Sequence, residues 1–93
     1  MFIGACEIEL YLHGCQSLKE KRQVLRSLLD RLQNQFNASI AEVDYQDLWQ
    51  RAAIGVAVVG NDKVIIERVL NRIITFTENH PGVELVDYEI EIW

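Results

Sequence analysis

Residues 51–60 read Arg-Ala-Ala-Ile-Gly-Val-Ala-Val-Val-Gly, and every position after the arginine is apolar or glycine. A strand with one face toward solvent alternates polar and apolar residues. A short run that is apolar on both faces is instead typical of a strand with neighbours on both sides. This segment therefore predicts a central strand of a sheet.

On either side of this strand, the apolar residues repeat every two residues in some segments, as in strands, and every three or four residues in others, as in helices. Residues 2–12 alternate in polarity, with Cys6 and Leu10 on the apolar parity, as a half-buried strand does. Ser17 and Glu20 have capping-box spacing and open a helix whose leucines recur every three or four residues. The predicted elements are a strand over residues 2–12, a helix from Ser17 to residues 35–37, strands over residues 38–45 and 51–60, a helix that follows Asn61-Asp62 and stops at residues 79–82, and a strand over residues 83–93.

This order of elements predicts an α+β fold, the ferredoxin-like βαββαβ sandwich, as a single domain over residues 1–93. We expect a four-stranded antiparallel sheet in the order 4-1-3-2, with both helices on one face. The first and third strands are then central, which agrees with the apolar character of residues 51–60. In the last strand, the alternation places on the core face Val86, Tyr88, Ile90 and Ile92.

The length and composition suit one ordinary globular core. With 93 residues, 49% of them apolar, the chain needs no disulfide, so we expect Cys6 and Cys15 to be reduced. No basic start precedes an apolar run, so no signal peptide is expected. The longest uncharged apolar stretch, residues 52–60, is far shorter than the ~20 residues of a membrane span. We expect a cytoplasmic protein with no membrane-spanning segment.

The formal net charge of −5 hides a division between the elements. Eight of the nine basic residues fall in the predicted helices, which carry +3, while the rest of the chain carries −8. Lys19, Lys21 and Arg22 crowd the start of the first helix, where the helix dipole disfavours cations and a bound phosphate or carboxylate would offset that cost. Ser17, Lys19, Lys21, Arg22 and Arg26 are the candidate residues of an RNA or anion site. The alternative is that the helices carry basic residues only for solubility.

The sheet face away from the helices is predicted to be acidic. RNA-recognition domains of this fold stack bases on aromatic residues of the first and third strands. Here Tyr11 is the lone aromatic residue at those positions, beside Glu7 and Glu9, so we expect no RNA on this face. The small residues of the third strand allow close packing against another copy of the chain; alternatively, the face is simply solvated.

The connection between the second and third strands contains Trp49. A tryptophan there either covers the end of the core, which we favour, or contacts a partner. Arg51 would supply a counter-charge for the acidic sheet face. Tyr11, Trp49 and Arg51 are the candidate partner contacts.

No set of residues indicates catalysis, a metal or a cofactor. Acylphosphatases share this fold and size, but their phosphate-binding loop ends in an arginine, and residues 13–17 contain none. His13 and Cys15 are two metal-type ligands without a second pair. We therefore expect no enzymatic activity, no cofactor and no metal.

Residues 17–22, Ser-Leu-Lys-Glu-Lys-Arg, open the first helix, and residues 41–44, Ala-Glu-Val-Asp, lead to residues 47–52, Asp-Leu-Trp-Gln-Arg-Ala. In these segments the chain resembles the YlxP-like family, small bacterial proteins generally described as a domain of unknown function. The resemblance covers essentially the whole chain and implies a ferredoxin-like domain without known catalytic residues. Genes of this family often neighbour those for transcription-elongation, translation-initiation and ribosome-maturation factors, which implies a role around ribosome assembly or translation by association.

The charge division and the resemblance together favour one hypothesis. It is a non-enzymatic accessory factor that binds ribosomal RNA or a ribosome-associated protein through the basic helical side, with Lys19, Lys21, Arg22 and Arg26 as phosphate contacts. One alternative is a dimeric domain that binds a small molecule or anion at the start of the first helix. The other is a protein-interaction module, or a homo-oligomer, that uses the open sheet face or an edge strand.

Overall fold

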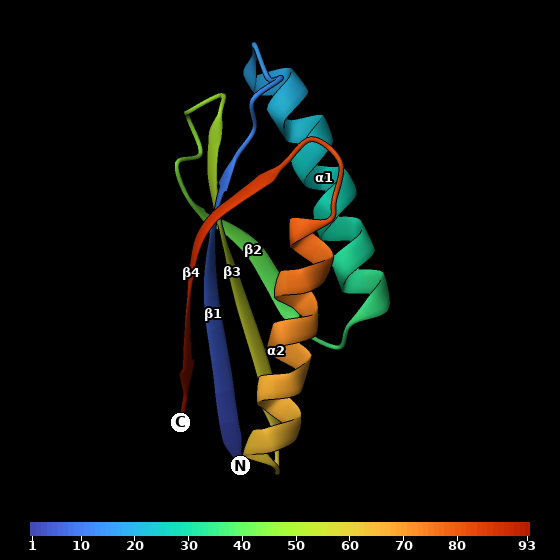
Figure 1. Cartoon of the computed structure of the whole chain (residues 1–93), viewed down its shortest axis with the longest axis vertical. Helices are drawn as coiled ribbons and strands as arrows, with labels where there is room; N and C mark the ends of the chain where they lie inside the picture. The colour runs from blue at the N-terminus through green and yellow to red at the C-terminus, as the bar shows by residue number, and fades with distance from the viewer.

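A computed structural model describes all residues, 1–93, and its element order confirms the one predicted from the sequence. The elements are β1 (Phe2–Tyr11), α1 (Leu18–Gln35), β2 (Ser39–Asp44), β3 (Arg51–Gly60), α2 (Lys63–Glu78) and β4 (Glu84–Ile92). The strands form one antiparallel sheet in the order β2-β3-β1-β4, which is the predicted order read from the other edge. Both helices cover the same face of the sheet (Figure 1).

The two central strands pair along their full length, from Phe2 opposite Gly60 to Tyr11 opposite Arg51. The molecule is 42 Å long, and both chain termini lie at one end of it. The β1–α1 and β2–β3 loops lie together at the other end (Figure 1). Loops that are far apart in the sequence are therefore close neighbours at the end opposite the termini.

The core lies between the sheet and the helices, as the apolar periods predict. Cys6, Ile8 and Leu10 of β1 are buried against the inward rows of both helices. Each helix begins at a polar cap: Ser17 Oγ accepts the hydrogen bond of the Glu20 amide in α1, and Asp62 caps α2 in the same way. No helix is both long and apolar enough to cross a bilayer.

The last strand departs from the predicted alternation. A register shift between β1 and β4 at Glu9/Leu10 brings Leu85 opposite Leu10 and leaves Val86 outside the core, with 54% of its surface exposed. The prediction that Val86 packs inward is therefore wrong, because an extra residue in one strand reverses the faces of the residues beyond it. Tyr88, opposite Ile8 on the edge strand, is also exposed.

Candidate functional site

Lys21 does not lie on the basic surface that the sequence predicts. Its side chain is 1% exposed, and it belongs to the inward row of α1 with Leu25, Leu28 and Leu32. Residues spaced by three or four positions share a helix face, so position 21 points where the leucines point. The prediction of Lys21 as a phosphate contact is wrong because no ligand in solvent can reach its ammonium group.

The buried ammonium group of Lys21 joins α1 to the end of β2. It donates a hydrogen bond to the backbone carbonyl of Tyr45 and forms an ion pair with Glu42, with Nζ and Oε2 3.0 Å apart. Tyr45 has a positive φ of 60°, which is uncommon for a residue with a side chain. Lys21 therefore holds in place the turn that begins the β2–β3 loop.

The other three predicted cations of α1 are exposed and share a row, which we call the cation row: Lys19, Arg22 and Arg26. Their spacing of three and four residues places them on one side of the helix. Gln33 continues this row, and its amide donates to the carbonyl of Ile40 in β2. The cation row therefore lies on the flank of α1 toward β2, and none of its members forms an ion pair within the chain.

The start of α1 is occupied by the chain's own polar groups. Ser17 Oγ accepts from the Glu20 amide at 3.1 Å, and Glu20 Oε2 accepts from the Gln16 amide at 2.6 Å. Two amides that an anion would use are thus already bonded, and a carboxylate stands beside them. The structure gives Ser17 a capping role, and its role in anion binding stays a prediction.

Three of the remaining helical cations, Lys63, Arg68 and Arg72, lie on α2. A groove of about 700 Å³ runs along α2 beside the end of α1, and Arg68 and Arg72 line it. The guanidinium of Arg72 lies 5.8 Å from the centre of the Phe36 ring. The basic helical side is therefore two separate groups of cations rather than one continuous surface.

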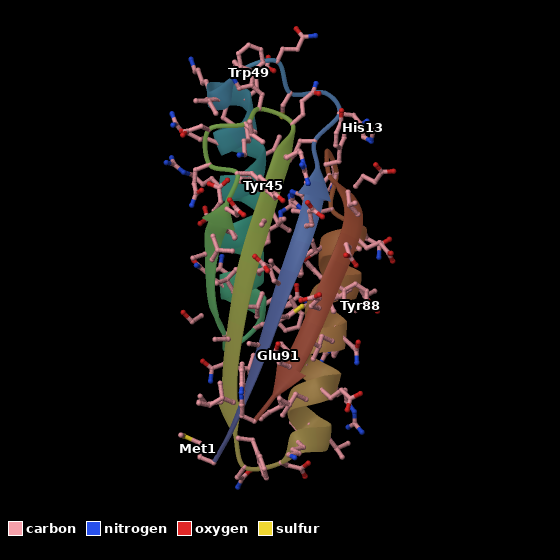
Figure 2. All side chains as sticks on the ribbon, turned by 90° about the vertical axis from the view of Figure 1, so that its left-hand side faces the viewer. Met1, His13, Tyr45, Trp49, Tyr88 and Glu91 are labelled. Atoms are coloured by element: carbon pink, nitrogen blue, oxygen red, sulfur yellow. The ribbon has the colours of Figure 1, made fainter.

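The predicted partner contacts Tyr11, Trp49 and Arg51 do come together, at the end of the molecule opposite the termini. They line a hollow of about 490 Å³, which we call the hairpin-tip hollow: Tyr11, Asp47, Leu48, Trp49, Gln50 and Arg51. Trp49 is 53% exposed and Leu48 is 45% exposed. The favoured prediction that Trp49 covers the core is wrong, because Trp49 lies at the surface of the tip (Figure 2).

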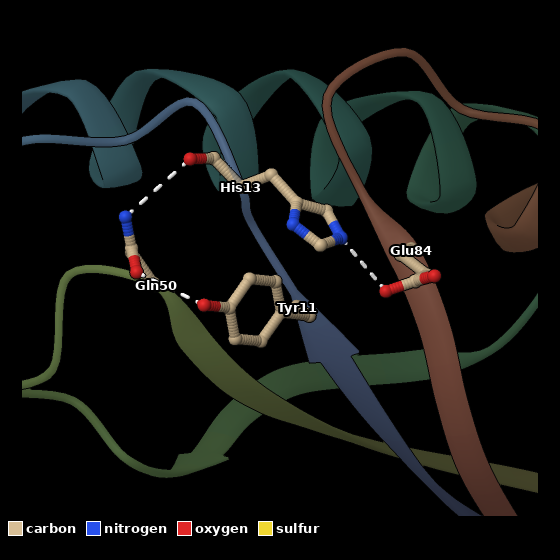
Figure 3. A network of polar contacts seen from close by, with 4 residues as sticks. All are labelled: Tyr11, His13, Gln50 and Glu84. Atoms are coloured by element: carbon tan, nitrogen blue, oxygen red, sulfur yellow. Dashed lines mark hydrogen bonds and ion pairs between the residues drawn. The ribbon is translucent and has the colours of Figure 1, made fainter.

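Gln50 fixes the loop that carries Trp49. The hydroxyl of Tyr11 donates to Gln50 Oε1 at 3.1 Å, and Gln50 Nε2 donates to the carbonyl of His13 (Figure 3). Gln50 Nε2 also donates to the carbonyl of Cys15. His13 in turn pairs with Glu84 at 2.8 Å. These bonds join the β2–β3 loop to the β1–α1 loop and to β4, so the tip is held from both sides.

Arg51 is the counter-charge that the sequence predicts for the acidic sheet face. Its guanidinium pairs with Glu9 and lies 4.3 Å from the centre of the Tyr45 ring. The pKa of Tyr45 is raised, mainly by a hydrogen bond to Glu9, although the charge of Arg51 opposes this shift. Beyond this pair the face holds uncompensated carboxylates, with Glu7 directly opposite Glu89.

Both cysteine thiols are free and buried. Burial, with a smaller contribution from Glu7, raises the pKa of Cys6 to about 11. Burial and the charge of Glu20 also raise the pKa of Cys15, although Lys21 opposes them. The neutral thiol is the favoured form of both, so neither is poised as a nucleophile. No three His, Cys, Asp or Glu side chains are grouped so that they could hold a metal ion.

Sequence reasoning missed three residues of this end of the molecule. Glu42, Tyr45 and Gln50 hold the loop, yet each looks like an ordinary strand or loop residue. The one available signal was the position of Lys21 in the leucine period, which requires a buried partner for its charge.

Comparisons with known proteins agree with this fold and leave the activity open. A family model described as "Protein of unknown function (DUF503)" matches residues 3–90. The uncharacterized protein YlxP of Bacillus subtilis (strain 168) is 45% identical over 82 residues, which are 88% of this chain and 89% of that protein.

Among solved structures, two designed proteins are similar. Foldit4 has a TM-score of 0.55 and 15% identity over 98% of this chain and 96% of its own. LFR1 1, described as a designed protein with a ferredoxin fold, has a TM-score of 0.56 and 12% identity over 98% of this chain and 86% of its own. At such identities the likeness concerns the fold alone, and it supports the ferredoxin-like assignment.

Proposed function

The chain belongs to the family of proteins of unknown function DUF503, and we propose that it is a non-enzymatic domain that binds RNA through the cation row. One observation carries the proposal. At this end of the molecule Lys21 and Arg51 are paired within the chain, while Lys19, Arg22 and Arg26 are exposed and unpaired. Exposed cations without internal partners are the groups that contact phosphates.

The distribution of acidic residues supports the same side of the molecule. The open sheet face carries carboxylates on β1 and β4, including the facing pair Glu7 and Glu89, with Arg51 as their one basic neighbour. Such a face repels a polyanion, so RNA would approach α1. The resemblance implies a role around ribosome assembly or translation, so the proposal takes ribosomal RNA as the target and includes ribosome association.

Fluorescence anisotropy with a labelled fragment of ribosomal RNA tests the proposal. Binding of the wild type should weaken with salt, with a log–log slope of about −2 for three phosphate contacts. A variant with Lys19→Ala, Arg22→Ala and Arg26→Ala should lose most of the affinity and most of this slope. All three side chains are exposed, so the variant should fold normally.

The matched control removes three exposed charges from α2. Lys63→Ala, Arg68→Ala and Arg72→Ala change the net charge by the same amount, and the proposal expects them to retain most of the affinity. Equal losses in the two variants would mean that net charge, not the cation row, controls binding. An absence of binding by the wild type at low salt would overturn the proposed function.

A further inference from the structure

The hairpin tip presents a large aromatic ring on an anchored loop. Trp49 is 53% exposed, and the residues on both sides of it are fixed. The Tyr45 carbonyl accepts from Lys21 and from the Leu48 amide, and Gln50 is bonded to the β1–α1 loop. The ring is therefore held at the surface by a preorganised segment, so binding a ligand there needs little further ordering.

The hairpin-tip hollow offers a stacking surface rather than a set of free hydrogen-bonding groups. Both ends of the Gln50 amide are already bonded, Tyr11 donates to Gln50, and Arg51 is paired with Glu9. Asp47 alone among the charged side chains of the hollow has no partner within the chain, and its carboxylate would repel a phosphate. A flat, uncharged group that lies beside a phosphate chain fits this chemistry, and a nucleobase is such a group.

The hollow lies at the end of the molecule where the cation row begins. Lys21, at the end of the first turn of α1, bonds to the loop at Tyr45, and Gln50 bonds to Cys15, three residues before α1 begins. The cation row lies on the flank of α1 toward β2, and the loop is the direct continuation of β2. Trp49 and the start of α1 therefore lie at the same end of the molecule (Figures 1 and 2).

We infer that Trp49 is a stacking platform for an unpaired base of the RNA whose phosphates the cation row contacts. This inference rests on the proposed function and narrows its substrate to RNA that is single-stranded at the contact. The ring stacks on the face of one base, the phosphates on either side lie toward Lys19 and Arg22, and Asp47 keeps the backbone out of the hollow. Because the free hydrogen-bonding side chains of the hollow are only Asp47 and the indole N–H of Trp49 itself, the preference for one base over another is small.

The test uses the full chain with Trp93→Phe, which leaves Trp49 as the single tryptophan. Its fluorescence is followed during titration with oligouridylate, with oligoadenylate and with an RNA duplex of the same length. Both single strands should quench the emission, and the duplex should not. The affinity of Trp49→Leu is measured by the fluorescence anisotropy of labelled RNA. This variant should lose about tenfold in single-strand affinity, the loss typical of one base–aromatic stack, with little change for the duplex or in the salt slope. Trp93→Leu, at the opposite end of the molecule, should leave the affinity unchanged.

The outcomes separate the inference from the proposed function. If RNA binds and the cation-row variant abolishes binding, but Trp49→Leu binds single strands as the wild type does, the stacking inference is overturned and the proposed function stands. Equal quenching by duplex and single strand overturns the inference as well, since a duplex exposes a base face only at its two ends. If the wild type binds none of these RNAs, both are overturned, and the exposed tip is then better explained as a protein contact.

Discussion

Lys21 differs from Lys19 and Arg22 in environment, although all three lie within one turn of α1 and carry the same charge. Lys21 is buried among leucines, with its charge paired to Glu42, whereas the other two are exposed and unpaired. The difference follows from the helical period, because position 21 is in line with all three buried leucines, at four, seven and eleven residues before Leu25, Leu28 and Leu32. Lys19 and Arg22 do not have this spacing and lie on other sides of the helix. The period, rather than the residue type, decides which lysine is structural and which is free to bind.

The two environments also make different contributions. An exposed cation contributes little to stability and is available to a ligand. A buried cation contributes only through its partners, and its removal leaves those partners without a counter-charge. Here the partners are Glu42 and the carbonyl of Tyr45, so the effect of Lys21 should extend to the loop that carries Trp49.

The sharpest way to break this comparison is to remove each lysine in turn. Lys21→Ala should lower the free energy of unfolding by about 3 kcal/mol, because it opens a cavity and leaves Glu42 with no counter-charge. Lys19→Ala should change it by less than about 0.5 kcal/mol, as expected at an exposed site. Urea unfolding of both variants measures the difference.

Lys21→Met serves as the control for packing. It restores most of the buried volume without the charge, so it should recover part of the loss, and Lys21→Met with Glu42→Gln should recover more. Equal stabilities of the Lys19→Ala and Lys21→Ala variants would contradict the assignment of Lys21 to the core.

Periodicity predicts the fold well because each element is several periods long. An error of a residue or two at the end of an element therefore does not change its type. The apolar β3 segment indicated the central strand, and the strand order follows from it. The burial of Lys21 could have been predicted from the same leucine period, but a charged residue type outweighed the period in our interpretation. The exposed position of Trp49 could not be predicted, since residues 45–50 have no period and their conformation depends on tertiary bonds to Lys21 and Cys15. The displacement of Val86 likewise depends on pairing with β1.

The two histidines give a second comparison of a buried and an exposed side chain, this time as a function of pH. The expected effect on stability is smaller than that of Lys21→Ala, because a buried histidine can lose its proton and become neutral. His80 is 7% exposed, and its Nδ1 has no hydrogen-bond partner, whereas His13 is exposed and paired with Glu84. Burial, and then the charge of Arg31, lower the pKa of His80. The unfolded chain thus takes up the proton first, so stability should be complete above pH 6.5 and decrease as the pH falls below it.

Unfolding measured at pH 7.5 and at pH 5.5, on either side of the ordinary histidine pKa of about 6.5, checks this prediction. The wild type should lose stability between the two, and His80→Gln should lose less. If His80→Gln and the wild type show the same pH dependence, His80 is not the group responsible.

Ser17, the cap of α1, has a structural role in the helix and a predicted role in anion binding, and the two can be tested separately. Ser17→Ala should lower the free energy of unfolding by about 1 kcal/mol, because the Glu20 amide loses its acceptor. Asp62→Ala, at the cap of α2, should have a similar effect and provides the matched comparison.

Thermal unfolding in the presence and absence of phosphate distinguishes the two roles of Ser17. If phosphate raises the melting temperature of the wild type but not that of Ser17→Ala, Ser17 belongs to an anion site, as the dimeric anion-binding alternative requires.

The smallest effect is expected for the exposed counterpart of the Lys21–Glu42 pair, which is Arg51 with Glu9. These side chains are 45% and 26% exposed, so solvent screens their attraction, and a double-mutant cycle with Arg51→Ala and Glu9→Ala should give a coupling energy of about 0.5 kcal/mol. The same cycle for Lys21→Met and Glu42→Gln should give a larger coupling, because there the ammonium group is removed from water. A coupling at Arg51–Glu9 equal to that at Lys21–Glu42 would mean that the environment does not separate the two pairs. The buried Lys21–Glu42 pair and the exposed Arg51–Glu9 pair would then differ in position but not in coupling energy.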